Sequence, residues 1–433
     1  MANIDNTSLW QKVAPNRGMS PALAGEAQAD VGIIGGGFTG LSTALHLARK
    51  GVRVAVIEGA AVGNGGSGRN NGQVIPTLAG SEPAGLEAAY GAAGERLVAL
   101  VRGSAEYLFR MAEAEGIDCE AEQTGWFQPA HTPAYLALSE ARVKAWSARG
   151  APCEVLDAAQ GREMLGSDFW YGGMYNPTGG HINPLMLVRG LARACVAAGV
   201  VIYEKSTVKD VVRDGRRWKV SAGSGSLMCS KVLLATNAYS GELTGGLMPE
   251  VARSIMPVLT WQMATAPLDA DLRTSIVPGR QAVSDTRGDL RYFRYDARGR
   301  LVAGGGLILP FAGRARVQKL VAARLVEAFP QLGTPPRFEH TWSGLVAVTP
   351  NHLPHFHELG PGFYSAIGYN GRGVALSISL GRELAQLLAG GKAQDLALPM
   401  SAPRAIPMHG LTRRVARTAL LYYRLKDTQR PKI

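Results

Sequence analysis

Short apolar runs separated by a glycine-rich turn characterise residues 30–58. Residues 30–34 have the uniformly apolar pattern of a short buried strand. Residues 41–48 then carry apolar side chains at helical spacing, and Lys50 and Gly51 close that helix. A second apolar run, VRVAVIE, follows and ends at Glu58. The pattern therefore predicts a strand–helix–strand unit, which is typical of an α/β fold.

Similar patterns return later in the chain. The sequence predicts a helix over about 184–198 that leads into a strand, and a buried strand in KVLLATNAYSGEL that ends at Thr236. Residues 290–306 predict two strands joined by a turn at 296–299, and residues 320–332 contain a helix that Pro330 closes. A strand over 364–367 enters a third glycine-rich turn, and a helix begins near Val374. We find no internal repeat.

Length and composition indicate a globular protein with more than one lobe. The 433 residues exceed one ordinary domain, and 46% are hydrophobic while 18% are charged. The four cysteines lie far apart and form no CxxC pair, which argues against a disulfide framework or a zinc knuckle and for a reducing compartment.

The two ends of the chain bear on location and partners. The N-terminus lacks the basic start and apolar run of a secretory signal, and no window of about 18 apolar residues exists, so we expect a cytoplasmic protein without a membrane span. The net charge is +12, and part of it lies in residues 401–433. Because these basic residues are scattered and no nucleic-acid motif accompanies them, we predict a basic arm whose Leu and Tyr side chains pack on the body. Weak contact of this arm with an anionic membrane is the alternative, and nucleic acid is not an expected partner.

The first glycine cluster predicts a dinucleotide site. Gly35, Gly37 and Gly40 form G-x-G-x-x-G between the strand and the helix, with Phe38 and Thr39 inside the motif. These glycines allow the tight turn, the approach of a pyrophosphate, and close packing of helix on strand. The helix N-terminus offers free N–H groups to the phosphates.

Glu58 completes this unit, 23 positions after Gly35. Its carboxylate can accept both ribose hydroxyls and repels a 2′-phosphate, so NADP is disfavoured. The motif alone does not separate FAD from NAD. The next segment, GAAVGNGGSGRNNGQV, favours FAD, because such a loop cannot pack a core but can wrap an elongated ligand with backbone amides and polar side chains. The candidate ligand-binding residues of this loop are Gly66, Ser67, Gly68, Arg69, Asn70, Asn71, Gly72 and Gln73.

Three segments together resemble a known family. DVGIIGGGFTGLSTALHLARKG, GGSGRNNGQV and GYNGRGVALSISLGRELA are similar to the D-amino-acid oxidase-type FAD-dependent oxidoreductases, which include glycine, sarcosine and dimethylglycine oxidases. The leader SLWQKVAP and the tail LLYYRLKD resemble the gamma-glutamylputrescine oxidase branch. The resemblance covers nearly the whole chain. It is specific for the family and much less so for the substrate.

The resemblance implies a fold and a division of the chain. We expect a Rossmann-type FAD-binding domain made of residues 1–84, 183–247 and 338–400. Residues 85–182 and 248–337 are expected to form an inserted, mostly antiparallel β-sheet lobe that binds substrate.

The resemblance also implies further cofactor contacts. Val208 is expected to meet the adenine through its backbone, and the helix at the third glycine turn to point its dipole at the flavin N1/C2=O edge. Because no Cys lies between residues 330 and 368 and the early loop contains no His, we expect FAD to be bound non-covalently. The additional cofactor candidates are Thr236, Asn237, Gly344, Gly368, Asn370, Gly371, Arg372, Gly373 and Val374.

The reaction implied by the resemblance is amine oxidation. A hydride passes from the carbon next to nitrogen to flavin N5, the imine hydrolyses to a carbonyl product, and O2 reoxidises the flavin and gives H2O2. Primary and secondary amines, polyamine derivatives and amino acids are all candidate substrates. His181, Tyr292 and Trp342 are the candidate pocket residues, with core packing as the alternative for each.

Two other site types are weighed against the same residues. His352, His355 and His357 invite a metal site, but Pro354 interrupts their spacing and no acidic ligand adjoins, so we predict none. Asn351 stands where the family more often has an acid. Arg291 and Arg294 lie three apart in a predicted strand and face opposite sides, so no carboxylate clamp is evident, which favours an amine over a free amino acid.

Three hypotheses for the function remain open. The first is the FAD-dependent oxidase described above. The second is a dehydrogenase of the same fold that passes electrons to a quinone or another carrier. The third is a flavin-binding partner without catalysis.

Overall fold

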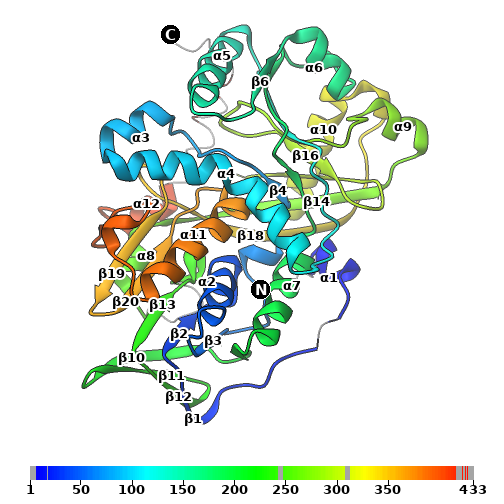
Figure 1. The fold of residues 1–433 in the computed structure, drawn as a ribbon. Helices are drawn as coiled ribbons and strands as arrows, with labels where there is room; N and C mark the ends of the chain where they lie inside the picture. Colours follow the sequence, from blue (N-terminus) through cyan, green and yellow to red (C-terminus); the bar gives the residue numbers. More distant parts are fainter. Residues whose placement is uncertain are drawn as a thin grey trace.

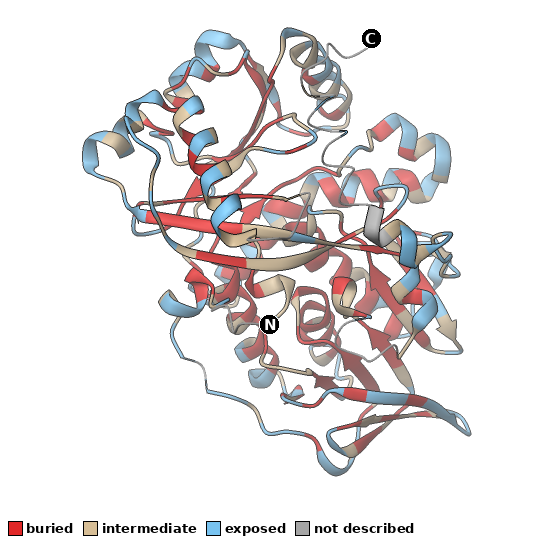
Figure 2. Cartoon of the chain, turned by 180° about the vertical axis from the view of Figure 1, so that it is seen from behind, coloured by how far each residue is buried: buried red, intermediate tan, exposed pale blue. Residues whose placement is uncertain are grey.

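The computed structural model describes residues 6–16, 18–241, 247–307 and 313–415, together with Tyr422, Leu425 and Asp427. Two large sheets dominate it, and the chain crosses between them repeatedly (Figure 1). The buried residues lie along the central strands and on the helices that cover them, while the outer helices expose one face (Figure 2). The predicted α/β architecture is confirmed.

The first sheet has seven strands in the order β21-β19-β20-β13-β2-β3-β9, and all pairs except β19–β20 are parallel. The strands β2 and β3 are buried along their whole length, as a parallel sheet covered on both faces requires. The seven strands are β2 (Val31–Ile34), β3 (Val54–Ile57), β9 (Val201–Tyr203), β13 (Lys231–Leu234), β19 (His355–Gly360), β20 (Phe363–Ile367) and β21 (Met400–Ser401).

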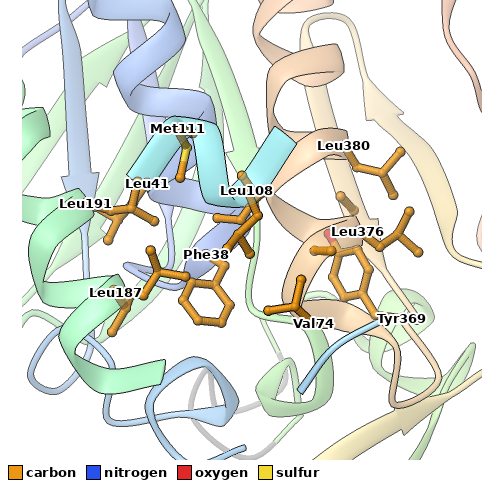
Figure 3. Packing of buried hydrophobic residues seen from close by; sticks show 14 of the residues in the cluster. Phe38, Leu41, Val74, Leu108, Met111, Leu187, Leu191, Tyr369, Leu376 and Leu380 are labelled. Carbon is orange, nitrogen blue, oxygen red and sulfur yellow. The ribbon is translucent and has the colours of Figure 1, made fainter. Parts of the chain in front are cut away.

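Four helices pack together on one side of this sheet. The helix α2 (Phe38–Ala48) contacts α7 (Pro184–Ala197) and α11 (Gly373–Leu388), and α11 also contacts α4 (Ala92–Ala114). Figure 3 shows the apolar contacts between them: Phe38 and Leu41 lie near Leu187 and Leu191 of α7, while Leu376 comes from α11. This packing fixes the N-termini of α2 and α11 above the same end of the sheet.

The second sheet has eight strands in the order β18-β14-β17-β16-β15-β5-β7-β6, and only β15 and β5 pair in parallel. It is the mostly antiparallel lobe that the sequence predicts. Its strands are β5 (Trp126–Pro129), β6 (Glu154–Leu156), β7 (Gly173–Asn176), β14 (Met256–Pro267), β15 (Ala282–Ser284), β16 (Tyr292–Tyr295), β17 (Arg300–Gly305) and β18 (Phe338–Val348). On its outer side lie α5 (Pro133–Ser147), α6 (Ala158–Leu165), α9 (Ala270–Ser275) and α10 (Gly313–Ala328).

The pairing corrects one predicted boundary. Residues 338–348 were expected in the FAD-binding part, but β18 pairs with β14 along nearly its whole length and so belongs to the eight-stranded sheet. The remaining division into two functional parts stays a prediction.

Smaller elements complete the fold: a four-stranded sheet of β1 (Ala24–Gln28), β12 (Ser224–Cys229), β11 (Arg217–Ala222) and β10 (Val208–Asp214), a pair of β4 (Gln73–Val74) with β8 (Gly180–His181), and the helices α1 (Leu9–Val13), α3 (Pro83–Tyr90), α8 (Pro249–Arg253) and α12 (His409–Val415).

Residues 416–421, 423, 424, 426 and 428–433 of the basic arm lie outside the described residues. Three of its Leu and Tyr side chains are described: Leu411, Tyr422 and Leu425 are 54%, 61% and 58% exposed. More than half of each of these three side chains is exposed, so the predicted packing of the arm on the body is incomplete for them. The arm instead meets the second lobe through Asp427, whose carboxylate accepts hydrogen bonds from the N–H groups of Gly288 and Asp289.

Candidate functional site: a dinucleotide cradle facing a polar sheet

The turn between β2 and α2 is shaped by glycine. Gly35 has φ +112°, and a Cβ there would lie 2.8 Å from the carbonyl oxygen of Ala235. A Cβ at Gly40 would lie 2.1 Å from the carbonyl oxygen of Gly35, so the helix could not pack so closely on the turn. Gly37 caps α2 without a side-chain hydrogen bond. The partial positive charge of the helix N-terminus is thereby presented at the end of the sheet.

Glu58 lies beside this turn at the end of β3. Its two carboxylate oxygens accept hydrogen bonds from the N–H of Gly36 at 2.8 Å and of Ala60 at 2.9 Å. Each oxygen keeps a further lone pair for a ribose hydroxyl. Desolvation raises the pKa of Glu58, and the nearby charge of Glu204 raises it further.

Glu204 is a residue that the sequence analysis missed. It follows β9, is 1% exposed, and accepts a hydrogen bond from the N–H of Val62 at 2.7 Å. An acid after a third parallel strand was the available signal, because strand ends of one sheet meet at the same edge. Two carboxylates at this edge strengthen the discrimination against a 2′-phosphate.

The loop of residues 66–73 closes over the helix N-terminus. Ser67 Oγ accepts a hydrogen bond from the N–H of Phe38 at 3.0 Å. Asn70 folds the loop on itself: its Nδ2 donates to the carbonyls of Gly66 and Ser67, and its Oδ1 accepts from the N–H of Gly72. These contacts hold the loop where the sequence predicts phosphate and flavin binding.

The third glycine turn meets the first at the same place. Asn237 Oδ1 accepts a hydrogen bond from the N–H of Gly368 at 2.9 Å, which joins the end of β13 to the end of β20. The hydroxyls of Thr39 and Tyr369 are 2.6 Å apart and join α2 to this turn. Three segments far apart in sequence therefore converge. Among the other predicted cofactor residues of these segments, Asn370 Oδ1 accepts from the N–H of Thr349, Thr236 bonds Ser240, and Gly371, Gly373 and Val374 lead into α11.

Arg372 caps α11 and reaches the second sheet. Its guanidinium carbon lies 5.0 Å from the ring centroid of Trp126 on β5. Within the described part of the chain the Arg372 side chain has neither an ion pair nor a hydrogen bond, and desolvation lowers its pKa to about 9. It remains a cation at neutral pH, so an anionic group of a ligand would find a partner here.

A chain of neutral side chains links the flavin loop to the second sheet. Asn71 Nδ2 donates to Gln262 Oε1 at 3.1 Å, and Gln262 Nε2 donates to the hydroxyl of Tyr292 at 2.8 Å. Asn71 Oδ1 is buried and has no hydrogen-bond partner among the described residues. A buried acceptor without a donor is costly, so this atom fits a ligand that supplies one.

The other predicted pocket residues bond to the backbone. His181 is 1% exposed, its Nε2 lies 3.0 Å from the carbonyl oxygen of Arg280, and burial lowers its pKa well below the usual value, so it is neutral. Trp342 donates its indole N–H to the carbonyl of Arg69 at 2.8 Å. Both side chains thus bond backbone carbonyl groups, and a role for them in a substrate pocket stays a prediction. Of the three candidates, only Tyr292 joins the polar chain.

Several further predicted residues are placed by the same contacts. The guanidinium of Arg69 donates to the carbonyls of Asn6 and Ser343, and its Cβ lies beside Gly344. Gln73 Nε2 donates to the carbonyl of Val283 on β15. Val208 begins β10 opposite Ala222, and its contact with adenine stays a prediction.

Neither Arg291 nor Arg294 is available to bind a substrate carboxylate. Arg291 pairs with Glu327, while Arg294 on the opposite side of β16 is buried and donates to backbone carbonyls. Among the histidines of the weighed metal site, His355 contacts Asn351 and His357 contacts Ser401. Within the described residues no three His, Cys, Asp or Glu side chains form a group that could hold a metal ion.

Different features of the site fit different parts of an FAD molecule. The N-terminus of α2, where the N-cap Gly37 supplies no side chain, suits a pyrophosphate, Glu58 suits a ribose, and the convergence of three loops suits a ligand longer than a mononucleotide. The family model of FAD-dependent oxidoreductases named DAO matches residues 30–387, which include all three loops. The chain belongs to this family. It is an FAD-dependent oxidoreductase.

Individual relatives agree with this membership. The chain is 33% identical over 402 residues to gamma-glutamylputrescine oxidoreductase of Escherichia coli (strain K12), which covers 92% of each protein. It is 32% identical over 433 residues to the probable oxidoreductase OrdL of Rhizobium meliloti (strain 1021), which covers 97% of each.

Solved structures share the fold at lower identity. The L-proline dehydrogenase from P. horikoshii superimposes with a TM-score of 0.72 at 20% identity, over 87% of this chain and 96% of that one. The glycine oxidase from Geobacillus kaustophilus gives a TM-score of 0.69 at 23% identity, over 84% of this chain and 96% of that one. In the described part of the chain, no helix is both long and apolar enough to cross a bilayer.

Proposed function

We propose that the protein is an amine oxidase that acts on a CH–NH or CH–NH2 group and uses O2 as electron acceptor. When bound, FAD supplies the hydride acceptor, its N5 atom, and passes the electrons on to O2. The names of the relatives support an amine or amino-acid substrate, since they include gamma-glutamylputrescine oxidoreductase and glycine oxidase. The imine formed from the substrate then hydrolyses to a carbonyl product.

The observation that carries the proposal is the polar chain from Asn71 through Gln262 to Tyr292. It lies where the flavin loop contacts the second sheet, so a substrate held there lies beside the loop. Asn71 Oδ1 is positioned to accept a hydrogen bond from the N–H of an amine. We assign this contact the task of orienting the carbon next to nitrogen.

The same residues favour the neutral form of the amine. Asn71 and Gln262 carry no charge, and burial raises the pKa of Tyr292, so its hydroxyl stays protonated. A buried site lined by these neutral groups disfavours a protonated amine, and only the neutral amine can release a hydride from the adjacent carbon. His181 does not act as a base in this scheme. Its burial and its contact with the carbonyl oxygen of Arg280 hold it apart from Asn71, Gln262 and Tyr292.

Oxygen uptake tests the proposal. We expect at least one compound from a panel of polyamines, N-methyl amino acids and D-amino acids to consume O2 and release an equal amount of H2O2. Turnover only with an added quinone would instead support the dehydrogenase alternative. Acid precipitation tests the non-covalent attachment of FAD: the yellow colour is expected in the supernatant, and colour retained in the pellet would overturn it.

The four cysteines are free and buried, which supports the reducing, cytoplasmic location expected from the sequence.

A further inference from the structure

Three consecutive carbonyl groups of the flavin loop are held by large side chains from elsewhere. Each of the residues 69, 70 and 71 has its carbonyl oxygen bonded by a ring or guanidinium N–H. Trp342 Nε1 donates to Arg69 at 2.8 Å, Trp10 Nε1 donates to Asn70 at 2.9 Å, and Arg294 Nε donates to Asn71 at 2.9 Å.

The three donors also contact one another. The rings of Trp10 and Trp342 meet edge to face, with centroids 5.7 Å apart and planes at 75°. The guanidinium of Arg294 lies 4.6 Å from the ring centroid of Trp10. All three side chains are at most 1% exposed. They come from α1, β18 and β16, so three distant elements fix one short loop. We call these three residues the carbonyl clamp.

Arg294 ties the clamp to the strand pair behind the loop. It also donates to the carbonyl of Ile182 at 2.9 Å, next to β8. A Cβ at Gly72, which has φ +88°, would lie 2.6 Å from its Nη2. The glycine is therefore required both by the backbone conformation and by the approach of this guanidinium.

The N-terminal segment crosses the loop a second time. Arg69 Nη2 donates to the carbonyl of Asn6 at 2.6 Å, and Asn6 Oδ1 accepts a hydrogen bond from the N–H of Ser343 at 2.8 Å. The segment from Asn6 to Val13 thus holds the loop against β18 at two points, one on each side of Ser8.

We infer that this N-terminal segment is a working part of the cofactor site, and that Trp10, Trp342 and Arg294 are positioning residues that set the flavin loop for FAD. The inference rests on the assignment of residues 66–73 to the flavin. The clamp binds the carbonyl groups of residues 69–71, and Asn71 Oδ1 and the N-terminus of α2 beside Ser67 are left for the ligand. Because the loop is already ordered before FAD binds, the conformational entropy lost on ordering it does not weaken FAD binding.

Trp10→Phe and Trp342→Phe test the inference in the full-length chain. Each keeps an aromatic ring and removes one N–H donor. Trp146→Phe is the matched control: Trp146 is 1% exposed and donates its N–H to Glu82 Oε2 at 2.9 Å, away from the loop. FAD is added to each apoprotein, and the dissociation constant, the visible spectrum of the bound flavin and the melting temperature of the apoprotein are measured.

We expect Trp10→Phe and Trp342→Phe to weaken FAD binding about tenfold, the loss of one buried hydrogen bond, and to change the flavin spectrum. Trp146→Phe is expected to lower the melting temperature of the apoprotein about as much as the other two variants do. Its FAD affinity is expected to stay within about twofold of that of the unmodified protein. The inference is overturned if all three variants keep the FAD affinity of the unmodified protein, or if all three lose the same amount of it.

Asn6→Ala covers the case in which a tryptophan variant does not fold, because Asn6 is exposed and its removal leaves the core intact. A loss of FAD affinity of about threefold is expected, as for one exposed hydrogen bond, and unchanged affinity contradicts the inference. No amine is present in these measurements, so a failure of the clamp is distinct from a failure of the proposed oxidation.

Discussion

The two sides of the site differ in the groups that form their polar contacts. On the cofactor side, the polar contacts are mostly to backbone groups: Glu58 binds two N–H groups, Ser67 one, and Asn237 the N–H of Gly368. On the sheet side, side chains bond side chains, as in the chain from Asn71 to Tyr292.

This difference has a consequence for tolerance to change. A backbone cradle depends on glycines and on close approach, so a single Cβ disrupts it. A side-chain surface can lose one member and keep its shape. We therefore expect substitutions on the cofactor side to abolish flavin binding, and those of Gln262 and Tyr292 on the sheet side to alter turnover with the flavin in place.

Gly40→Ala should have the largest effect. The new Cβ would meet the carbonyl oxygen of Gly35 at 2.1 Å, so α2 must move away from the turn. We expect the protein to purify without flavin and to lose about 1–3 kcal/mol of stability. Flavin content per chain and chemical unfolding measure this. Gly103→Ala is the control: a Cβ there meets nothing within 4 Å in α4, so the same change should stabilise the helix slightly. Full flavin occupancy in Gly40→Ala would contradict the assignment of this turn.

Glu58→Gln should weaken FAD binding about tenfold to a hundredfold, because a neutral amide replaces a charged acceptor of ribose hydroxyls. The pKa of Glu58 is raised by burial, so the carboxylate gains its proton at a higher pH than an ordinary glutamate does. FAD affinity of the unmodified protein should therefore fall as the pH drops through that pKa, and the variant should lack this dependence. Titration of apoprotein with FAD at several pH values provides the comparison. A variant with the same acid dependence would show that another group is responsible.

Tyr292→Phe should act on the other side of the comparison. It removes the hydroxyl that accepts from Gln262 and leaves the ring. We expect kcat/KM for the amine to fall about threefold to tenfold, while FAD affinity stays unchanged. Steady-state kinetics together with FAD titration separate the two effects. Loss of flavin from this variant would mean that the two sides are not independent.

His181→Gln should have the smallest effect on turnover and a defined effect on stability. Burial lowers the pKa of His181 below its ordinary value of 6.5, so the unfolded chain binds more protons in acid. The stability contribution is present above pH 6.5 and is lost as the pH falls towards the lowered pKa, by up to about 1.4 kcal/mol per pH unit. The variant should lose less stability between pH 7 and 5 than the unmodified protein, as unfolding at each pH would show. An identical pH dependence would contradict the buried, neutral state of His181.

The cofactor side could be predicted from the sequence because its determinants are local. Gly35, Gly37 and Gly40 with Glu58 lie within one strand–helix–strand unit, and the spacing that predicts the site is the spacing that builds it. The loop after it is equally recognisable from its glycines and amides.

The sheet side could not be predicted in the same way. Gln262 meets Tyr292 and Asn71 only because β14, β17 and β16 are neighbours in the folded sheet, and no spacing along the chain encodes that order. Trp342 was ambiguous for the same reason, since its partner Trp10 lies far away in the sequence. Glu204 shows the limit within the parallel sheet: its signal exists only once β9 is known to lie beside β3.

Anaerobic reduction of the bound flavin tests the central claim most directly. The purified holoprotein is mixed without O2 with members of the amine panel, and the visible absorption of the oxidised flavin is followed. We predict bleaching by an amine with a C–H next to nitrogen, faster at a pH that favours its neutral form, and none by the alcohol of the same shape. A flavin that remains oxidised with every amine would contradict the account and support a flavin-binding role without catalysis.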